Sequence, residues 1–393
     1  MDADVIVIGA GPAGCSAAYH LVRGGMKVRL LEREEFPREK TCGDALSPEA
    51  MSLLREMGLT EFCAQAHRID GSLVLSPNGD CMETYTPDPG AMVERPALDE
   101  ALLEVAVAAG AQLETDSTFV ELNGKGGRVT ARTASGRVFP GQYAVLATGC
   151  NAAALKAAHM LDGAAGPSAL GRRAYFEGVK CPERLIVHSF DRFLLPGYGW
   201  VFPLGDGRAN IGVAAHCDAA STRDLKESFE RFVGDSLVSG NLLTGARQVS
   251  PARTAPLRTG FRGSRPAVGR VLAVGDAAGA AVPSNGEGIP SALITGRLAA
   301  EAILRALDND ASPRTAARTY RRSLRRRFAR RMRRAGWARR AMGSPRFLNW
   351  FVRCARRDRR LADRMCWVLA GVRSPLQLLS PACLKGMLPG VAD

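Results

Sequence analysis

The sequence lacks three features that would place the protein in a membrane, a secreted or a zinc-binding class. It has no run of about 18 uninterrupted apolar residues, which excludes a helix that spans a bilayer. Its ten cysteines form no CxxC pair, so neither a disulfide framework nor a zinc site is expected. No charged and then apolar leader follows Met1, which predicts a cytoplasmic protein with reduced thiols.

Aromatic residues are scarce, at 6%, beside 46% hydrophobic and 23% charged residues. These proportions are close to those of ordinary globular proteins and exclude collagen-like, coiled-coil and wholly disordered chains. A chain of 393 residues is too long for one small core. We therefore predict two domains and an appendage.

Lysine is absent from the most basic segment of the chain. Residues 314–364 contain 20 arginines, no lysine and two aspartates, whereas residues 1–313 carry a net charge of −5 within a total of +14. The basic character therefore belongs to the C-terminal region, residues 311–393, and needs an explanation separate from that of the acidic body.

The C-terminal region has the pattern of amphipathic helices. Tyr320, Leu324, Phe328 and Met332 recur four residues apart and form an apolar stripe flanked by arginines. Such a region fits the surface of an anionic membrane, which would make the protein peripheral on the inner face. The alternative is that the stripe docks on the body of the protein, with its arginines in solvent. Nucleic acid is not expected as a partner, because no reader motif is present.

The first fifty residues follow the order of a dinucleotide-binding unit. The apolar run Asp4–Ile8 leads into the glycine turn Gly9–Gly14, and a second apolar run, Lys27–Leu31, ends at Glu32. The glycines allow a tight turn, close approach to a pyrophosphate and close packing of the following helix, whose N-terminus faces the phosphates. Glu32 is placed to accept hydrogen bonds from the adenosine ribose.

A second glycine-rich corner lies near residue 276. The apolar run from Arg270 to Val274 ends in Gly275 and Asp276, and a loop with two glycines then enters a helix predicted over residues 291–307. A carboxylate at the carboxyl end of a strand can hold the ribityl hydroxyls of a flavin. The positive end of the helix would stabilise the negative charge of a reduced flavin.

These motifs resemble those of the geranylgeranyl reductase family of FAD enzymes, which has the para-hydroxybenzoate hydroxylase fold. The resemblance covers about residues 3–307. It rests on the glycine turn, on segments 36–43, 275–279 and 285–289, and on segments 195–204 and 210–213, which are similar to the family's Tyr-x-Trp-x-Phe-Pro signature. It implies an α/β fold with a Rossmann-like FAD-binding domain, an antiparallel-sheet substrate domain and a C-terminal helical tail.

The resemblance also implies a set of flavin-binding residues. Arg95, at the start of a predicted helix, would pair with the cofactor phosphates. The chain departs from the family at residues 147–150, where Ala-Thr-Gly-Cys replaces the usual Ala-Asp-Gly. The residues that match the family's flavin site are Gly9, Gly11, Gly14, Glu32, Arg33, Cys42, Gly43, Arg95, Asp276, Gly286, Gly288 and Ile289.

Tyr198, Trp200 and Phe202 alternate with small or aliphatic residues, and a period of two places their rings on one face of a strand. Most such faces pack against a helix. Together with the resemblance, however, they predict one wall of a substrate cavity. An apolar cavity suits a polyprenyl chain, which can be bound only through buried apolar area.

Reducing an isolated double bond requires a proton on one carbon while a hydride reaches the other. Tyr198, Cys42 and a bound water are the candidates for this acid, and Trp200 completes the predicted catalytic set. A tyrosine or a cysteine of ordinary pKa is protonated near neutral pH and could donate, though weakly. No metal ligands are predicted.

The sequence thus predicts an FAD-dependent reductase that saturates double bonds of a geranylgeranyl lipid or a prenyl quinone. The external reductant, NAD(P)H or ferredoxin, stays open, because no second nucleotide-binding motif is present. A monooxygenase or a halogenase of the same fold, acting on an apolar natural product, is the alternative, since the fold does not determine whether the reduced flavin reacts with oxygen or with an alkene.

The predicted domains are discontinuous. The FAD-binding domain takes residues 1–65, 91–155 and 261–310, and the substrate domain takes residues 66–90 and 156–260. The basic helical region follows from residue 311.

Overall fold

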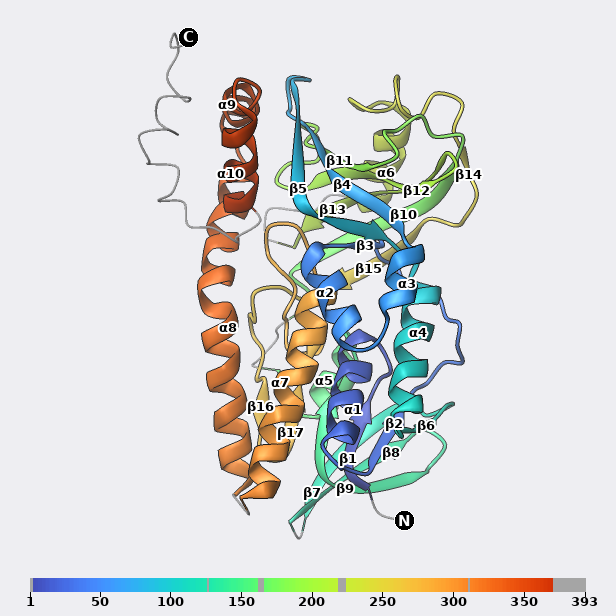
Figure 1. The fold of residues 1–393 in the computed structure, drawn as a ribbon, viewed down its shortest axis with the longest axis vertical. Helices are drawn as coiled ribbons and strands as arrows, with labels where there is room; N and C mark the ends of the chain where they lie inside the picture. The colour runs from blue at the N-terminus through green and yellow to red at the C-terminus, as the bar shows by residue number, and fades with distance from the viewer. Residues whose placement is uncertain (1–2, 126, 162–165, 218–223, 310–311, 370–393) are drawn as a thin grey trace.

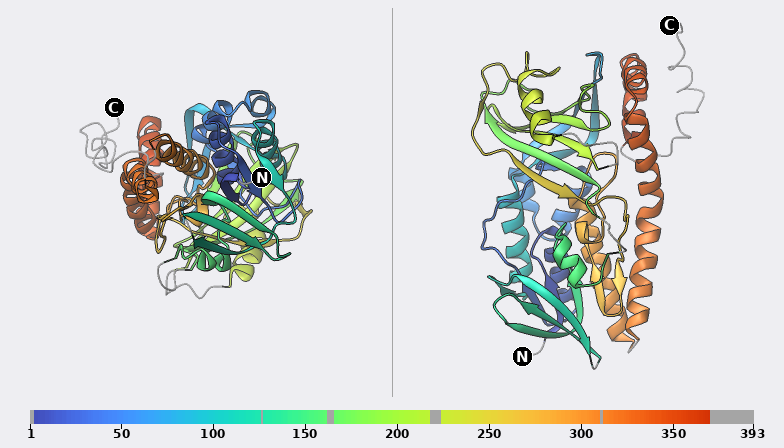
Figure 2. Two further views of the ribbon diagram at one scale, coloured as in Figure 1. Left: turned by 90° about the horizontal axis from the view of Figure 1, so that it is seen from below. Right: turned by 180° about the vertical axis from the view of Figure 1, so that it is seen from behind.

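The computed structural model describes residues 3–125, 127–161, 166–217, 224–309 and 312–369. Two β-sheets follow one another along the long axis of the molecule, and the C-terminal helices run beside them, the long helix beside the first sheet and the last two beside the second (Figure 1). The same arrangement is seen from behind and from below in Figure 2. The fold therefore consists of two sheet-based halves joined along one side by the C-terminal helices.

The first sheet has eight strands and a parallel centre in the order β17-β9-β1-β2-β6. Strand β1 is fully apolar from Val5 to Ile8 and buried on both faces, as expected for a central parallel strand. The strands are β1 (Ala3–Ile8), β2 (Val28–Leu31), β6 (Gln112–Glu114), β7 (Phe119–Lys125), β8 (Arg128–Thr133), β9 (Val138–Leu146), β16 (Ala267–Val268) and β17 (Val271–Ala273).

Helices pack beside this sheet. Helix α1 begins at Pro12, within the glycine segment Gly9–Gly14, and lies between α4 and α7 (Figure 1). Pro12, Pro48, Pro96 and Pro290 occupy the first turns of four helices, where the missing N–H costs nothing. The helices are α1 (Pro12–Arg23), α2 (Pro48–Glu56), α3 (Thr60–Gln65), α4 (Arg95–Ala108), α5 (Ala152–Ala157) and α7 (Ile289–Asp308).

The second sheet has nine strands and is mostly antiparallel, with one parallel pair between β4 and β11. One of its faces is covered by α6 (Leu225–Gly234), and the other turns toward the first sheet. The strands are β3 (Ala45–Leu46), β4 (His67–Leu75), β5 (Cys81–Met92), β10 (Ala169–Glu177), β11 (Leu185–Ser189), β12 (Tyr198–Gly205), β13 (Arg208–His216), β14 (Arg247–Gln248) and β15 (Arg253–Leu257).

The basic region forms three helices: α8 (Pro313–Met342), α9 (Pro345–Ala355) and α10 (Arg359–Leu369). Helix α8 packs on α7 and buries the whole apolar stripe; Tyr320 is fully buried and its hydroxyl donates to the carbonyl of Ala273 at 2.7 Å. The stripe is therefore used for docking on the body of the protein. Among the described residues, no helix is both long and apolar enough to cross a membrane.

The predicted fold class is confirmed in all three of its parts. The boundaries of the domains stay a prediction, although the short strand β3 pairs with β5 in the second sheet while lying inside the segment predicted to belong to the FAD-binding domain. A two-residue edge strand of this kind has no periodicity that a sequence could reveal.

Candidate active site

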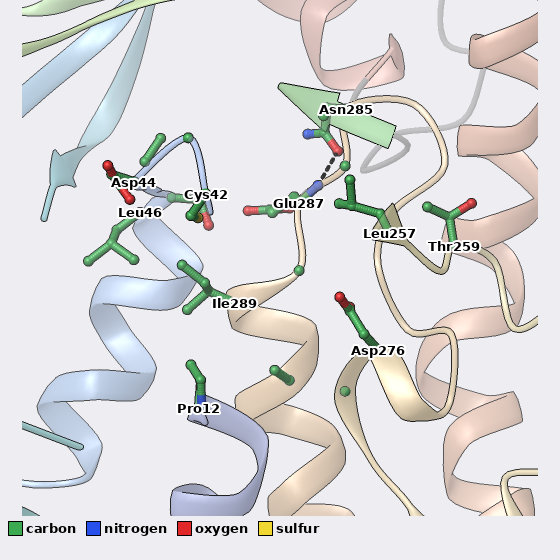
Figure 3. A pocket seen from close by; sticks show the side chains of 18 of the residues that line it. Pro12, Cys42, Asp44, Leu46, Leu257, Thr259, Asp276, Asn285, Glu287 and Ile289 are labelled. Carbon is green, nitrogen blue, oxygen red and sulfur yellow. Dashed lines mark hydrogen bonds between the residues drawn. The ribbon is translucent and has the colours of Figure 1, made fainter. Parts of the chain in front are cut away.

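A cavity of about 1040 Å³ extends from the first sheet to the second, and both glycine-rich corners open into it. In Figure 3, Pro12 at the start of α1 and Ile289 at the start of α7 face the same space, between residues 42–46 on one side and Asp276 on the other. The N-terminal ends of both helices therefore direct their positive potential into the cavity.

The first corner is shaped by glycines that no other residue could replace. Gly9 has a φ of +103°, and a Cβ there would lie 2.5 Å from the carbonyl oxygen of Ala147. A Cβ on Gly14 would lie 1.8 Å from the carbonyl oxygen of Gly9. Gly11 lines the cavity with only the tip of Arg38 nearby, so the backbone is open to a ligand there.

Carboxylates and arginines alternate beside this corner. The Glu32 carboxylate is buried and accepts the backbone N–H groups of Ala10, at 2.8 Å, and of Arg33, at 2.9 Å. Arg95 donates twice to Asp99, at 2.8 and 2.7 Å, and Arg38 approaches the same carboxylate at 3.3 Å. Arg38 was not among the residues predicted for the site, although it lies in the segment that carries the resemblance.

The second corner brings Asp276 next to Cys150. The Cys150 thiol donates to the carboxylate at 3.6 Å, and burial raises the pKa of Asp276. Gly286 has a φ of +70°, Gly288 lies against the Asp276 carboxylate, and Ile289 begins α7. The thiol of Cys150 thus lies against the carboxylate at this corner, while Thr148 stands where the family has its aspartate.

The three aromatic rings of β12 share one face and line the cavity. Ring centroids lie 6.0 Å apart for Tyr198 and Trp200 and 5.9 Å apart for Trp200 and Phe202. A Cβ on Gly43 would contact Phe202 at 3.2 Å, so the loop after Cys42 packs directly on this wall. The alternation in the sequence therefore does place the rings together.

One glycine makes room for these rings, and another makes room for a ring on the opposite face of the sheet. A Cβ on Gly212 would lie 2.3 Å from the Trp200 indole, and one on Gly199 would lie 2.2 Å from Phe232 on the opposite face of the sheet. His188 extends the wall, with its ring 5.2 Å from that of Phe202. Burial lowers the pKa of His188 to about 4, so this imidazole is neutral at physiological pH.

The hydroxyl of Tyr198 donates to the backbone carbonyl of Asn285 at 2.8 Å. Its proton is therefore engaged, and burial further raises its pKa. Cys42 lines the cavity with a free thiol, whose pKa is raised by burial and by the nearby carboxyl of Asp44. Of the two side chains predicted as acids, Tyr198 has its hydrogen in a hydrogen bond to the protein, whereas the Cys42 sulfur lies beside the Arg95 guanidinium and the backbone N–H of Asp44.

Asp44 is a residue of the cavity wall that the sequence did not single out. It is fully buried, and one carboxylate oxygen accepts the Tyr175 hydroxyl at 2.8 Å and the Asn210 amide at 2.7 Å. Asn210 also donates to the carbonyl of Cys42 and accepts from the Trp200 indole. Segment 210–213 belongs to the segments that resemble the family, but nothing in its spacing indicated these hydrogen bonds of Asn210.

The C-terminal helices form another wall of the cavity that the sequence did not predict. Helix α8 contributes five arginines, and α9 and α10 contribute Leu348, Phe351 and Trp367. The basic region is therefore part of the site and not only an appendage.

The donors and acceptors on the wall fit a polar dinucleotide. Several buried side-chain atoms on the cavity wall lack a hydrogen-bond partner among the residues that the structure describes, and four of them lie near the two corners and the loop after Cys42. They are Arg38 Nε, Asp44 Oδ1, Thr148 Oγ1 and Ser284 Oγ. Because an unpaired buried polar atom is costly, such atoms are expected where a ligand supplies the partner.

Comparison with known proteins agrees with this geometry. Residues 2–161 match the family model described as an FAD binding domain. The chain is 34% identical to menaquinone reductase of Mycobacterium tuberculosis over 328 residues, which cover 77% of this chain and 76% of that protein. It is 33% identical to digeranylgeranylglycerophospholipid reductase 2 of Methanothermobacter thermautotrophicus, over 77% of this chain and 79% of that one. The chain belongs to the geranylgeranyl reductase family.

Solved structures extend the likeness over the whole fold of this family member. A geranylgeranyl bacteriochlorophyll reductase-like protein from Thermoplasma acidophilum superposes with a TM-score of 0.82, at 21% identity, over 98% of this chain and 99% of that one. A flavin-dependent brominase superposes with a TM-score of 0.74 at 19% identity, over 94% of each chain. The family assignment makes the protein an FAD-dependent oxidoreductase, and the predicted resemblance is confirmed.

Proposed function

We propose that this protein uses reduced FAD to saturate carbon–carbon double bonds of a polyprenyl lipid or a prenyl quinone. The observation that carries the proposal is the continuity of the cavity, which joins both glycine-rich corners to the aromatic wall of β12 and to the apolar side chains of α9 and α10. Relatives named for the reduction of menaquinone and of a geranylgeranyl phospholipid support it.

In this proposal the first corner holds the diphosphate and ribose of FAD. Gly9, Gly11 and Gly14 leave the backbone open at the start of α1, and Glu32 faces the ribose with Arg33 beside it. Arg95 is bound to Asp99, so Arg38, with its unpaired Nε, is the arginine available to the phosphates. The role expected of Arg95 thus becomes one of holding Asp99 and, through it, Arg38.

The remaining predicted residues would surround the reactive part of the cofactor. Asp276 would hold the ribityl chain, and Gly286, Gly288 and Ile289 would place backbone N–H groups and the N-terminus of α7 beside the ring. Cys42 and Gly43 would lie on the side of the aromatic wall. When bound and reduced, FAD supplies the hydride for the double bond.

The chain itself must deliver the proton and exclude water. We infer that the Cys42 thiol donates the proton, and that Asp44 returns one to it, because the two groups are neighbours on the cavity wall and the Asp44 carboxyl raises the pKa of the thiol. Tyr198 and Trp200 would position the alkene without taking part in proton transfer, since both side chains donate their hydrogens to protein acceptors. NAD(P)H or reduced ferredoxin would reduce the flavin.

The test is a single-turnover reaction without oxygen. Holoenzyme with photoreduced FAD is mixed with geranylgeranyl diphosphate or with menaquinone, and the absorbance of oxidised flavin is followed. We expect reoxidation on mixing and a product heavier by two hydrogens for each bond reduced. Absence of both with every prenyl substrate would show the proposal to be wrong.

The same assay separates the alternative of a monooxygenase or a halogenase, whose flavin reacts with oxygen. Reoxidation that needs oxygen, with consumption of oxygen coupled to turnover of an apolar aromatic substrate, would favour the alternative. The experiment is needed because a brominase has the same fold, and the fold alone does not determine the reaction.

A further inference from the structure

Five arginines of α8 line the cavity, and neither FAD binding nor proton transfer uses them. They recur at intervals that place them on one face of the helix, and they are Arg326, Arg327, Arg330, Arg331 and Arg334. The apolar stripe that docks α8 on α7 lies on a different face. The arrangement therefore gives this helix one side for packing and one side for the cavity.

Two glutamates hold part of this arginine face in place. Arg327 pairs with Glu49, in the first turn of α2, and Arg331 pairs with both Glu49, at 2.8 Å, and Glu287. Glu287 belongs to the loop that precedes α7 and faces the cavity (Figure 3). The ion pairs fix the arginines beside the second glycine-rich corner.

The positive charge at this end of the cavity is only partly balanced. Arg326 and Arg330 have no carboxylate within ion-pair distance among the residues that the structure describes, and the Nε of Arg331 is buried without a hydrogen-bond partner there. Both free guanidinium groups are exposed at the cavity rim. An anionic ligand at this place would find strong donors that no protein group already occupies.

The other end of the cavity is apolar. Met342 at the end of α8, Leu348 and Phe351 of α9, and Val74 and Met82 of the second sheet form one buried cluster that borders the cavity. A helical rise of about 1.5 Å per residue puts Arg330 and Met342 about 18 Å apart along α8. A cavity that is cationic at one end and apolar at the other suits a long amphiphile with an anionic head.

We propose that the arginine face of α8 binds a phosphate or diphosphate head group of the prenyl substrate, while the chain extends toward α9 and α10. Arginine recognises phosphate through paired hydrogen bonds, and several arginines suit a head with more than one charge. An uncharged quinone ring would leave Arg326 and Arg330 without a partner. This inference rests on the proposed function and names the class of substrate within it.

The experiment measures binding to oxidised holoenzyme by calorimetry, so that it does not depend on turnover. The double variant Arg326→Gln/Arg330→Gln is compared with Arg322→Gln/Arg325→Gln, two exposed arginines of the same helix that do not line the cavity. The ligands are geranylgeranyl diphosphate, its uncharged alcohol geranylgeraniol, a geranylgeranyl glycerophospholipid and menaquinone. Circular dichroism and flavin content establish that each variant is folded.

We expect the cavity variant to bind geranylgeranyl diphosphate, the phospholipid or both about tenfold or more weakly, since hydrogen bonds to charged groups are strong. Its affinity for geranylgeraniol should not change, and the control variant should bind all four ligands normally. A loss of affinity for the diphosphate alone would identify a free prenyl diphosphate as the ligand. A loss of affinity for the phospholipid alone would identify a lipid head group.

Three results would overturn the inference. The first is an equal loss of affinity for the alcohol and the diphosphate, and the second is no loss of affinity for either phosphate ligand. The third is a loss of affinity confined to vesicles of anionic phospholipid, because it would mean that these arginines face a membrane. If the phosphate ligands bind as expected but no reduction occurs in the single-turnover assay, the proposed function fails and the anion site remains.

Discussion

Among single residues, Asp44 connects the loop after Cys42 with the second sheet. Its backbone has a φ of +64°, and its buried carboxylate accepts hydrogen bonds from Tyr175 and Asn210. Burial raises the pKa of Asp44 to about 6, although these hydrogen bonds and the nearby Arg173 oppose the rise. A carboxyl group that titrates close to neutral pH at a cavity wall is suited to exchanging protons.

The raised pKa of Asp44 predicts a pH dependence of stability. The folded protein holds this proton more tightly than the unfolded chain, whose aspartate has a pKa of about 3.8. The group's favourable contribution is therefore complete below pH about 4 and is lost as the pH rises through about 6, a change of about 3 kcal/mol. The side chain in Asp44→Asn does not titrate. We therefore expect the difference in free energy of unfolding, variant minus wild type, to rise by about this amount between the two pH values.

Urea unfolding of both proteins at several values between pH about 4 and about 7.5, followed by circular dichroism, measures this difference. Other titrating groups affect the two proteins alike, so the difference isolates Asp44. A difference that stays constant with pH would mean that the folded carboxyl has an ordinary pKa. In steady-state turnover, the wild-type rate should fall above pH about 6, and Asp44→Asn should lack this step if Asp44 returns the proton to Cys42.

Among elements, α8 is the one whose role the structure changes most. Its apolar side chains are buried against α7 and the first sheet, while its cavity-lining arginines face the site. Phe328 is 1% exposed and its ring lies 5.5 Å from that of Phe261. The docking of α8 therefore both stabilises the fold and closes one wall of the cavity.

Removing the Phe328 ring should release this helix. We expect Phe328→Ala to lower the free energy of unfolding by about 3–5 kcal/mol, because it leaves a cavity between α8 and the body. Trp337→Ala, at a side chain that is 43% exposed on the same helix, is the matched control and should cost about 0.5 kcal/mol or less. Urea midpoints and the rate of limited proteolysis within α8 measure both. Equal effects of the two substitutions would mean that α8 is not docked in solution.

For the whole molecule, the distribution of positive charge on the surface of α8 bears on whether the protein binds a membrane. Since the apolar stripe of α8 is buried, it is not available to a bilayer, but exposed arginines remain on the outer face of the helix, among them Arg322, Arg325 and Arg333. We propose that this face attracts the protein to an anionic membrane surface, where a lipid substrate would be at hand.

Sedimentation with vesicles tests this proposal. The triple variant Arg322→Gln/Arg325→Gln/Arg333→Gln should lose about 1 kcal/mol of binding for each arginine on anionic vesicles, and wild-type binding should weaken as salt is added. The variant Arg326→Gln/Arg330→Gln provides the control, because its arginines face the cavity. A wild-type protein that stays in the supernatant with anionic and neutral vesicles alike would rule out a peripheral location through α8.

Local patterns in the sequence are strong where the backbone itself is constrained. The glycine turn at Gly9–Gly14, the corner at Asp276 and the alternation of Tyr198, Trp200 and Phe202 could all be located from spacing, because each depends on neighbours in the chain. The family, the cofactor and the fold class followed from these segments. The assignment of single residues to FAD and to catalysis stays a prediction.

Contacts between distant segments could not be read in the same way. Asp44 meets Tyr175 and Asn210 across more than a hundred residues of sequence, and Arg38 reaches Asp99 from another element. Spacing carries no information about such pairs. The stripe of α8 was consistent with a membrane or with docking, and only the packing on α7 decided between them.

The sequence by itself determined that two glycine-rich corners and an aromatic strand face exist, since local geometry follows from the order of residues. Only the tertiary structure decided that they open into one cavity, that the carboxyl two residues after Cys42 is buried, and that the arginine face of α8 forms the rim. These facts depend on the free energy of packing whole elements together, and that free energy is a property of the complete fold and not of any one segment.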